Sequence, residues 1–208
     1  MIDSKQKGVI LILSGPSGAG KSSLYTALKE SFPNHYFSIS STTRDMRDGE
    51  VCGIHYNFVT KEQFQKDIEL GNFLEWAEVH GNYYGTSKAP ILNALEQGKL
   101  VIFDIDVQGQ VNVKKSFPNH TTSVFVTTKD SKILEDRLIS RGDMDSEAIK
   151  KRLKNARCEL DNISNFDYLL INDDFNTTAS ELICIVKSAF HKASLYDLES
   201  FNKSWSKL

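Results

Sequence analysis

The chain has 208 residues, of which 40% are hydrophobic and 25% are charged, and its net charge is −2 at neutral pH. These values are typical of one globular domain and give no sign of a protein that binds nucleic acid or a membrane surface through its overall charge. No apolar run approaches the ~20 residues that a transmembrane helix needs. Three widely spaced cysteines, Cys52, Cys158 and Cys184, fit neither a disulfide framework nor a zinc site. We therefore expect a cytoplasmic protein with free thiols, either a monomer or a homodimer.

Four short apolar runs stand out in the sequence, and each predicts a β-strand. They cover residues 9–13, 100–103, 123–126 and 168–171. The first run is continuous and rich in β-branched residues, which favours a strand buried on both faces, as in a parallel sheet. A helix is expected directly after it, because Leu24 and Leu28 are four residues apart and Pro33 would end the helix.

Two further helices are predicted from their end signals. Thr60 and Gln63 have the spacing of a capping box, and Gly71 lies where the helix that follows them would end. Ser87 is placed to cap another helix, which Gly98 would terminate.

Short strands are also expected at residues 36–40 and 73–79, the second followed by a turn at Gly81. Strands that alternate with helices favour βαβ units and a parallel sheet, so the predicted fold class is α/β. Residues 131–160 differ from this pattern because they are helical, highly charged and rich in arginine. The chain is therefore expected to form one domain with two excursions, at about residues 38–87 and 131–160.

A phosphate-binding motif lies between the first strand and the first helix. Eight consecutive residues match G-x-x-x-x-G-K-[ST], namely Gly15, Pro16, Ser17, Gly18, Ala19, Gly20, Lys21 and Ser22. Glycines let the backbone N–H groups converge on phosphate oxygens, and the helix start adds the positive end of its dipole. Lys21 can bridge the β- and γ-phosphates, and the Ser22 hydroxyl can ligate Mg²⁺. The motif predicts an ATP-type site, to which we also assign the adjacent Ser23.

Asp104 and Asp106 follow the second apolar run. Ligands on open α/β sheets bind at the carboxyl ends of the strands, which is where these carboxylates would lie. We expect one of the two to hold a water molecule of the Mg²⁺ shell. A solvated strand end would have the same local sequence.

Arg44 and Arg47 are three residues apart in a segment rich in hydroxyl side chains. Guanidinium groups suit the dianionic phosphate of a nucleotide, because they can hold it in bidentate fashion. Tyr56 and Tyr84 can add neutral donors to the same phosphate. The cluster alone does not exclude a solvated surface loop.

A longer tract makes this region more specific. Residues 40–44, 49–51, 56–59, 73–77, 81–86 and 104–109 read SSTTR, GEV, YNFV, FLEWA, GNYYGT and DIDVQG. In this order they resemble the guanylate kinase family, and the resemblance runs from about residue 8 to about residue 190. It implies a P-loop nucleoside-monophosphate-kinase core with a parallel sheet flanked by helices. This core would comprise residues 1–37, 88–130 and 161–208, with a GMP-binding insertion at 38–87 and a helical lid at 131–160.

The resemblance assigns two sets of residues to GMP. It implies that the phosphate is held by Arg44, Arg47, Tyr56 and Tyr84. It implies that guanine is read by Ser40, Glu75, Thr86 and Asp104. The chemistry agrees, because carboxylates can accept hydrogen bonds from the N1–H and the amine of guanine, and hydroxyls can donate to its O6. A site of this kind can reject an unmatched base by about 10⁴-fold.

The resemblance also assigns residues to ATP and to the reacting phosphates. It implies that lid arginines close over ATP and that Asn172 lies near the adenine. The implied catalytic set is Lys21, Arg44, Arg137, Arg141 and Arg152. Such cations stabilise charge on the phosphoryl group during transfer. A solvated pair of charged helices is the alternative interpretation of the lid segment.

The implied reaction is the reversible, Mg²⁺-dependent transfer of the γ-phosphoryl group of ATP to GMP, and to dGMP, in purine nucleotide metabolism. Two alternatives are a kinase of the same fold that phosphorylates a ribose bisphosphate, and a non-catalytic scaffold module that resembles guanylate kinase. The guanine-reading set argues against the first. The intact Gly15, Gly20, Lys21 and Ser22 argue against the second.

Overall fold

The computed structural model describes residues 7–79, 81–140, 142 and 145–206. Within these residues the chain forms nine strands and eight α-helices, together with two short 3₁₀ helices. No helix among them is long and apolar enough to cross a membrane.

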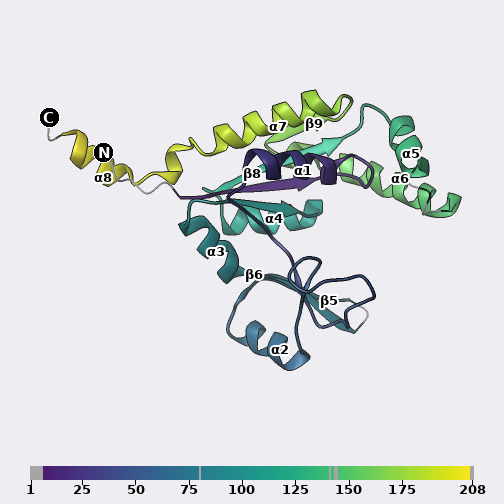
Figure 1. Ribbon diagram of the computed structural model, residues 1–208, viewed down its shortest axis with the longest axis horizontal. Helices are drawn as coiled ribbons and strands as arrows, with labels where there is room; N and C mark the ends of the chain where they lie inside the picture. Colours follow the sequence, from purple (N-terminus) through teal and green to yellow (C-terminus); the bar gives the residue numbers. More distant parts are fainter. Residues whose placement is uncertain (1–6, 80, 141, 143–144, 207–208) are drawn as a thin grey trace.

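A five-stranded parallel sheet forms the centre of the molecule. Its strand order is β2 (His35–Phe37), β7 (Leu100–Asp104), β1 (Val9–Ser14), β8 (Thr121–Thr127) and β9 (Tyr168–Ile171). Four helices cover it, with α1 (Lys21–Ser31) and α7 (Phe175–Ala189) on one face and α3 (Lys88–Glu96) and α4 (Val107–Ser116) on the other (Figure 1). The predicted α/β class with a parallel sheet flanked by helices is confirmed.

Strand β1 explains why the first apolar run is continuous. Val9, Leu11 and Leu13 pack against α1 and α7, whereas Ile10 and Ile12 pack against α3 and α4. Each of the five is at most 1% exposed. Successive side chains of a strand point to opposite faces, so a strand covered on both faces needs an apolar residue at every position.

Strand β9 differs from the other apolar strands because it lies at the edge of the sheet. Leu170 is buried, but Tyr168, Leu169 and Ile171 are 43–50% exposed. An apolar run by itself does not distinguish an edge strand from an interior one, since the difference lies in which elements cover the strand.

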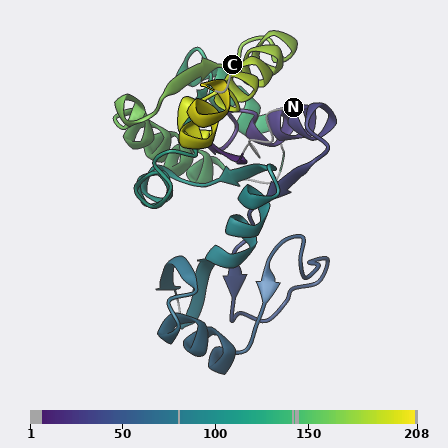
Figure 2. The same cartoon turned by 90° about the vertical axis from the view of Figure 1, so that its left-hand side faces the viewer.

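A second sheet forms from residues 41–87. Its strand order is β4 (Asn57–Phe58), β3 (Ser41–Thr42), β6 (Asn82–Ser87) and β5 (Phe73–Val79), and α2 (Lys61–Glu69) packs on one side. Figure 2 shows this unit standing apart from the first sheet. Its small core is aromatic, because fully buried Phe64 stacks on Phe73 and Tyr83 at centroid distances of 4.3 and 5.4 Å.

The strand predicted at residues 36–40 is shorter in the structure and ends at Phe37. Ser38 N–H still donates to the carbonyl oxygen of Ile102 in the first sheet, at 2.8 Å. Two residues later the carbonyl oxygen of Ser40 accepts from Asn57 N–H, at 2.9 Å, in the second sheet. The strand is cut short because residues 38–40 carry the chain from one sheet to the other.

The two predicted helix caps have different outcomes. Thr60 Oγ1 accepts from Gln63 N–H at 3.2 Å, as expected, although the Gln63 side chain donates to Asp67 instead of completing the capping box. Ser87 occupies the cap position of α3, but its side chain makes no capping bond. The predicted helix after Ser87 is confirmed, while the Ser87 Oγ lies 3.4 Å from Ser41 Oγ of the second sheet.

The arginine-rich segment folds as α5 (Ser131–Ser140) and α6 (Ser146–Leu160), which share a small apolar cluster around Leu134, Leu138 and Ile149. The remaining elements are the 3₁₀ helices at Ile163–Asn165 and Ala193–Leu195, and α8 (Leu198–Trp205). Helix α8 extends away from the body of the molecule (Figure 1).

Candidate active site

The loop between β1 and α1 is tight because two of its glycines leave no room for a side chain. A Cβ on Gly15, whose φ is +128°, would lie 2.0 Å from the carbonyl oxygen of Val126 in β8. A Cβ on Gly20, whose φ is +98°, would lie 2.2 Å from Nδ2 of Asn172. Residues that carry a side chain rarely adopt these positive φ angles. Both the close contacts and the backbone angles therefore require glycine.

Lys21 is the first residue of α1 and bends back over the loop. Its Nζ donates to the carbonyl oxygens of Gly15, at 2.5 Å, and Pro16, at 3.3 Å. It also lies 3.9 Å from Oδ1 of Asp104. Asp104 is near because β7 pairs with β1 so that Asp104 lies beside Leu13. The ammonium group is therefore held at the base of the loop, next to a carboxylate from the neighbouring strand.

The two aspartates that follow the second apolar run have different surroundings. Partial burial raises the pKa of Asp104 and Lys21 opposes this rise, while 37% of the Asp104 side chain remains exposed. Asp106 caps α4, because its Oδ1 accepts from Gln108 N–H at 3.1 Å and Gly109 N–H at 2.8 Å. Capping thus engages one carboxylate oxygen of Asp106, whereas the Asp104 carboxylate is partly exposed beside Lys21.

Arg137 and Asn172 meet on the other side of the P-loop. Arg137 donates to the carbonyl oxygen of Asn172 at 2.8 Å, and Nδ2 of buried Asn172 donates to the carbonyl oxygen of Ala19 at 2.8 Å. These residues border a pocket of about 500 Å³. Its lining is Gly18, Gly20, Ser23, Arg137, Ser140, Asn172, Asp173 and Phe175. The structure thus brings together one predicted lid arginine, the predicted adenine neighbour and the P-loop.

Helix α6 contacts the P-loop through one hydrogen bond. Arg152 donates to the hydroxyl oxygen of Ser17. The third predicted lid arginine, Arg141, lies outside the described residues.

Glu159 is a charged residue near the P-loop that the sequence prediction missed. Burial raises its pKa, with Lys21 opposing the rise and Asp106 adding to it. It follows Arg152 by seven residues, which is two helical turns on the same face of α6. That spacing is a signal that could have identified it.

The predicted guanine-reading residues of the second sheet lie on one face. Glu75 is the cross-strand neighbour of Thr86, and Thr86 Oγ1 donates to Glu75 Oε1 at 2.8 Å. Tyr84 is two residues from Thr86 on β6, so it points to the same side. Tyr56 lies beside it, with the two ring centroids 6.0 Å apart. Ser40 immediately precedes β3, and its carbonyl oxygen accepts from Asn57 N–H.

Arg44 is held in place by a neighbour that the prediction did not include. It donates to Glu50 Oε1 at 2.7 Å, and its guanidinium lies 5.5 Å from the ring centroid of Tyr56. The other oxygen of Glu50 accepts from Arg47 N–H at 2.8 Å. These hydrogen bonds, from Arg44 first, lower the pKa of Glu50 to about 2. Contacts with Glu50 and Tyr84 also raise the pKa of Arg44.

The predicted site residues therefore lie in two separate groups, one beside the P-loop of the first sheet and one on the second sheet. Among the described residues, no hydrogen bond or ion pair joins Asp104 to Glu75 or Thr86. Asp104 belongs to the group around Lys21 in this structure, although the resemblance places it near guanine as well.

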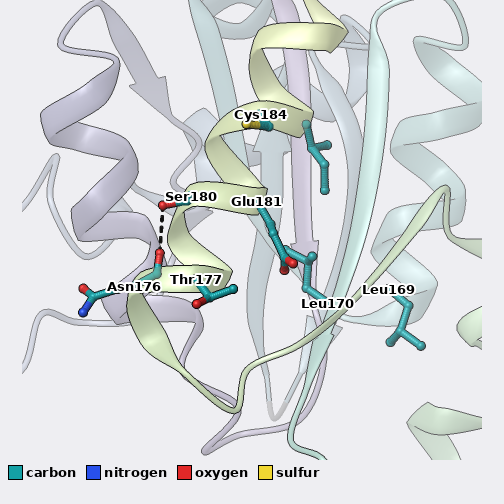
Figure 3. A pocket seen from close by; sticks show the side chains of 8 residues that line it. Leu169, Leu170, Asn176, Thr177, Ser180, Glu181 and Cys184 are labelled. Atoms are coloured by element: carbon teal, nitrogen blue, oxygen red, sulfur yellow. Dashed lines mark hydrogen bonds between the residues drawn. The ribbon is translucent and has the colours of Figure 1, made fainter.

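A separate open hollow of about 760 Å³ lies between edge strand β9 and α7. Figure 3 shows its lining, in which Ser180 Oγ donates to the carbonyl oxygen of Asn176 at 2.9 Å. Among the residues that the structure describes, none of the predicted site residues lines it, and neither does any arginine or lysine. It therefore lacks the cations that a nucleotide phosphate would need.

The fold and the loop define the protein as a P-loop protein with a parallel sheet. A second sheet beside it carries arginine, tyrosine and a carboxylate–hydroxyl pair. Nucleotide kinases are proteins of this class.

Comparison with known proteins narrows the class. A family model described as guanylate kinase matches residues 7–189. The chain is 51% identical over 201 residues to guanylate kinase of Wolinella succinogenes, covering 97% of this chain and 94% of that protein. It is 51% identical over 196 residues to guanylate kinase of Helicobacter pylori strain 26695, covering 94% and 95%. A crystal structure of guanylate kinase from Anaplasma phagocytophilum is similar, with a TM-score of 0.69, 29% identity and coverage of 93% and 92%. The chain belongs to the guanylate kinase family.

Proposed function

We propose that this protein transfers the γ-phosphoryl group of ATP to GMP, giving ADP and GDP. Membership of the guanylate kinase family supports the phosphoryl transfer, and the side chains of the second sheet support GMP as the acceptor. The observation that carries the proposal is the hydrogen-bonded pair of Glu75 and Thr86, on the same sheet face as Tyr56 and Tyr84. The carboxylate of Glu75 and the hydroxyl of Thr86, at one end of that face, suit the hydrogen-bonding groups of guanine. The phenol groups and Arg44, at the other end, suit the phosphate of GMP.

We assign residues 38–87 to GMP binding. In this assignment, Glu75 accepts from guanine while Ser40 and Thr86 supply hydroxyls. Arg44 would hold the phosphate together with exposed Arg47. The guanidinium of Arg44 is oriented for this, because two of its five N–H groups bond to Glu50 and to the carbonyl oxygen of Asp45, and Tyr84 is a further contact of the guanidinium.

We assign the P-loop and residues 131–160 to ATP. Lys21 would leave the carbonyl oxygens of Gly15 and Pro16 and contact the β- and γ-phosphates. Adenine would enter the pocket beside Asn172 and Arg137. Arg152, already at the P-loop, would contact the transferring group, and the remaining segments 1–37, 88–130 and 161–208 would form the core that holds both ligands.

The donors beside the P-loop fit Mg²⁺ that arrives with ATP. Ser22 is exposed on the first turn of α1, and the partly exposed carboxylate of Asp104 lies beside Lys21. Both are oxygen ligands, which Mg²⁺ prefers, and it commonly keeps several waters and takes its other ligands from the phosphates. Among the described residues there is no group of three or more His, Cys, Asp or Glu that could hold a metal ion. When bound, Mg²⁺ would neutralise charge on the phosphates.

The chain's own contribution to the reaction would be alignment and charge stabilisation. No protein nucleophile is needed, because an oxygen of the GMP phosphate attacks the γ-phosphorus. Lys21, Arg44 and the lid arginines would surround the group in transfer, and closure of both excursions would exclude water as a competing acceptor.

We also place the protein in the cytoplasm. Cys52, Cys158 and Cys184 are all exposed and free, which suits a reducing compartment.

The proposed reaction can be tested by measuring ADP production with Mg–ATP and each nucleoside monophosphate in turn. We expect turnover with GMP and dGMP only. Turnover with another monophosphate, or with none, would contradict the proposed acceptor.

Lys21→Met tests the role of the P-loop in the same assay. It removes the ammonium group but keeps a side chain of similar length, so turnover should fall to background while the fold persists. A kcat close to that of the wild type would contradict the catalytic assignment.

A further inference from the structure

Glu159 is a half-buried carboxylate on α6 whose place in the structure is not explained by folding. Its side chain forms no hydrogen bond or ion pair with any described residue. By contrast, Glu147 on the same helix is exposed and pairs with Lys150 at 2.9 Å. Leaving a carboxylate partly buried without a direct partner costs free energy, so its position calls for a reason other than stability.

The face of α6 that carries Glu159 is turned to the P-loop. Ala148, Arg152, Asn155 and Glu159 follow one another at intervals of four, three and four residues, which is the spacing of one helical face. Together with Ser17 and Lys151 they line a hollow of about 370 Å³. The hydrogen bond from Arg152 to Ser17 holds this face against the loop.

The charges that face Glu159 come from three elements. Lys21 of α1 attracts it, and Asp106 at the start of α4 repels it. Arg152 and Lys151 of its own helix line the same hollow. Glu159 therefore lines a hollow beside the P-loop, where it is influenced by the charge of Lys21, the residue that would receive the phosphates of a nucleotide.

A triphosphate bound at Lys21 would bring several negative charges towards Glu159. Partial burial weakens solvent screening, so the repulsion between these like charges would be appreciable. Mg²⁺ on the β- and γ-phosphates removes much of this charge. A repulsive group that acts on one form of a ligand more than on another is a common source of specificity.

We propose that Glu159 is a specificity-determining residue that disfavours metal-free ATP relative to Mg–ATP. This inference rests on the proposed binding of ATP at the P-loop. Glu159 acts through its charge on the bound phosphates and takes no part in the transfer itself.

The test is an equilibrium measurement by isothermal titration calorimetry. ATP is titrated into the wild type and into Glu159→Gln, once with EDTA and once with excess MgCl₂. Glu159→Gln should bind metal-free ATP about fivefold or more tightly than the wild type, a modest coupling for a single charge. Its affinity for Mg–ATP should change by less than about twofold. Glu159→Asp keeps the charge and should retain a preference for Mg–ATP close to that of the wild type.

Glu147→Gln is the matched control, because it removes the same charge from an 80%-exposed position on the same helix. It should leave both affinities unchanged, and an equal effect of Glu147→Gln would overturn the local role of Glu159. An unchanged preference in Glu159→Gln, or weaker binding of both forms of ATP, would also overturn it. Thermal melting checks the fold, and Glu159→Ala supplies a second variant without the charge. A wild type that binds no ATP would overturn the proposed function and this inference together, whereas normal wild-type binding with an unchanged preference would overturn only this inference.

Discussion

Replacing Gly15 with alanine should destabilise the protein and distort the P-loop. The added Cβ would lie 2.0 Å from the carbonyl oxygen of Val126 and 3.0 Å from its carbonyl carbon. Neither atom can yield easily, because Val126 is fully buried in an interior strand that is paired on both sides. The loop would have to move instead, which shifts the carbonyl oxygens that hold Lys21.

The size of the effect follows from two contributions. A side chain at a φ of +128° costs about 1–3 kcal/mol in backbone strain. Crowding a packed site costs about 1–3 kcal/mol more. The sum, about 2–6 kcal/mol, is a large part of the ~5–15 kcal/mol that stabilises a typical protein. At about 2–4 °C per kcal/mol for a chain of this length, Tm should fall by about 4–24 °C.

Thermal melting by circular dichroism and ATP titration by calorimetry measure the two consequences. The matched control is Gly71→Ala, because Gly71 has a φ of +66° but a Cβ there would meet no atom within 4 Å. The control should cost about 1–2 kcal/mol from strain alone and leave ATP binding intact. The reasoning would be refuted if Gly15→Ala melted within about 2 °C of the wild type and bound ATP normally. A control as damaging as Gly15→Ala would show that the dihedral, and not the contact with Val126, dominates.

Three further predictions concern the second sheet. Glu75→Gln should weaken GMP binding far more than ATP binding, because the carboxylate bonded to Thr86 belongs to the proposed guanine site. Equal losses of GMP affinity and ATP affinity, each measured by titration, would argue against that role. Phe64→Ala should lower the free energy of unfolding, measured in urea, by about 3–5 kcal/mol, because Phe64 is fully buried against Phe73 in the core of the second sheet. GMP affinity should fall while ATP affinity persists, because the first sheet has its own core. A parallel loss of both affinities would count against separate cores. Glu50 has a folded-state pKa of about 2 against a usual value of 4.5, so its stabilising effect is complete above pH of about 4.5 and is lost as the pH falls towards 2. The stability difference between the wild type and Glu50→Gln should therefore be constant from about pH 7 to 5 and shrink below about 4.5, and a difference that stayed flat to about pH 3 would be inconsistent with the Arg44 contact.

Local patterns in the sequence determined the elements that carry the site. The continuous run at residues 9–13 is β1, buried on both faces, and the P-loop follows it because glycine, lysine and serine lie at fixed spacings. The helix after Thr60 and the strand Phe73–Val79 were predictable for the same reason. Signals of this kind depend on neighbours within a few residues, so they can be read without knowing the fold. The roles of the individual site residues in binding and transfer remain predictions.

Only the tertiary structure decided which side chains meet. Lys21 lies beside Asp104 because β1 and β7 pair, and Arg137 bonds to Asn172 across 35 positions of the chain. Glu159 and Ser17 likewise line one hollow because α6 lies on the P-loop. The exposure of β9 follows from its place at the sheet edge, although its composition matches that of a buried strand. These features come from strand order, register and helix packing, which are set by contacts between distant parts of the chain, whereas periodicity and motifs report only on the residues close at hand.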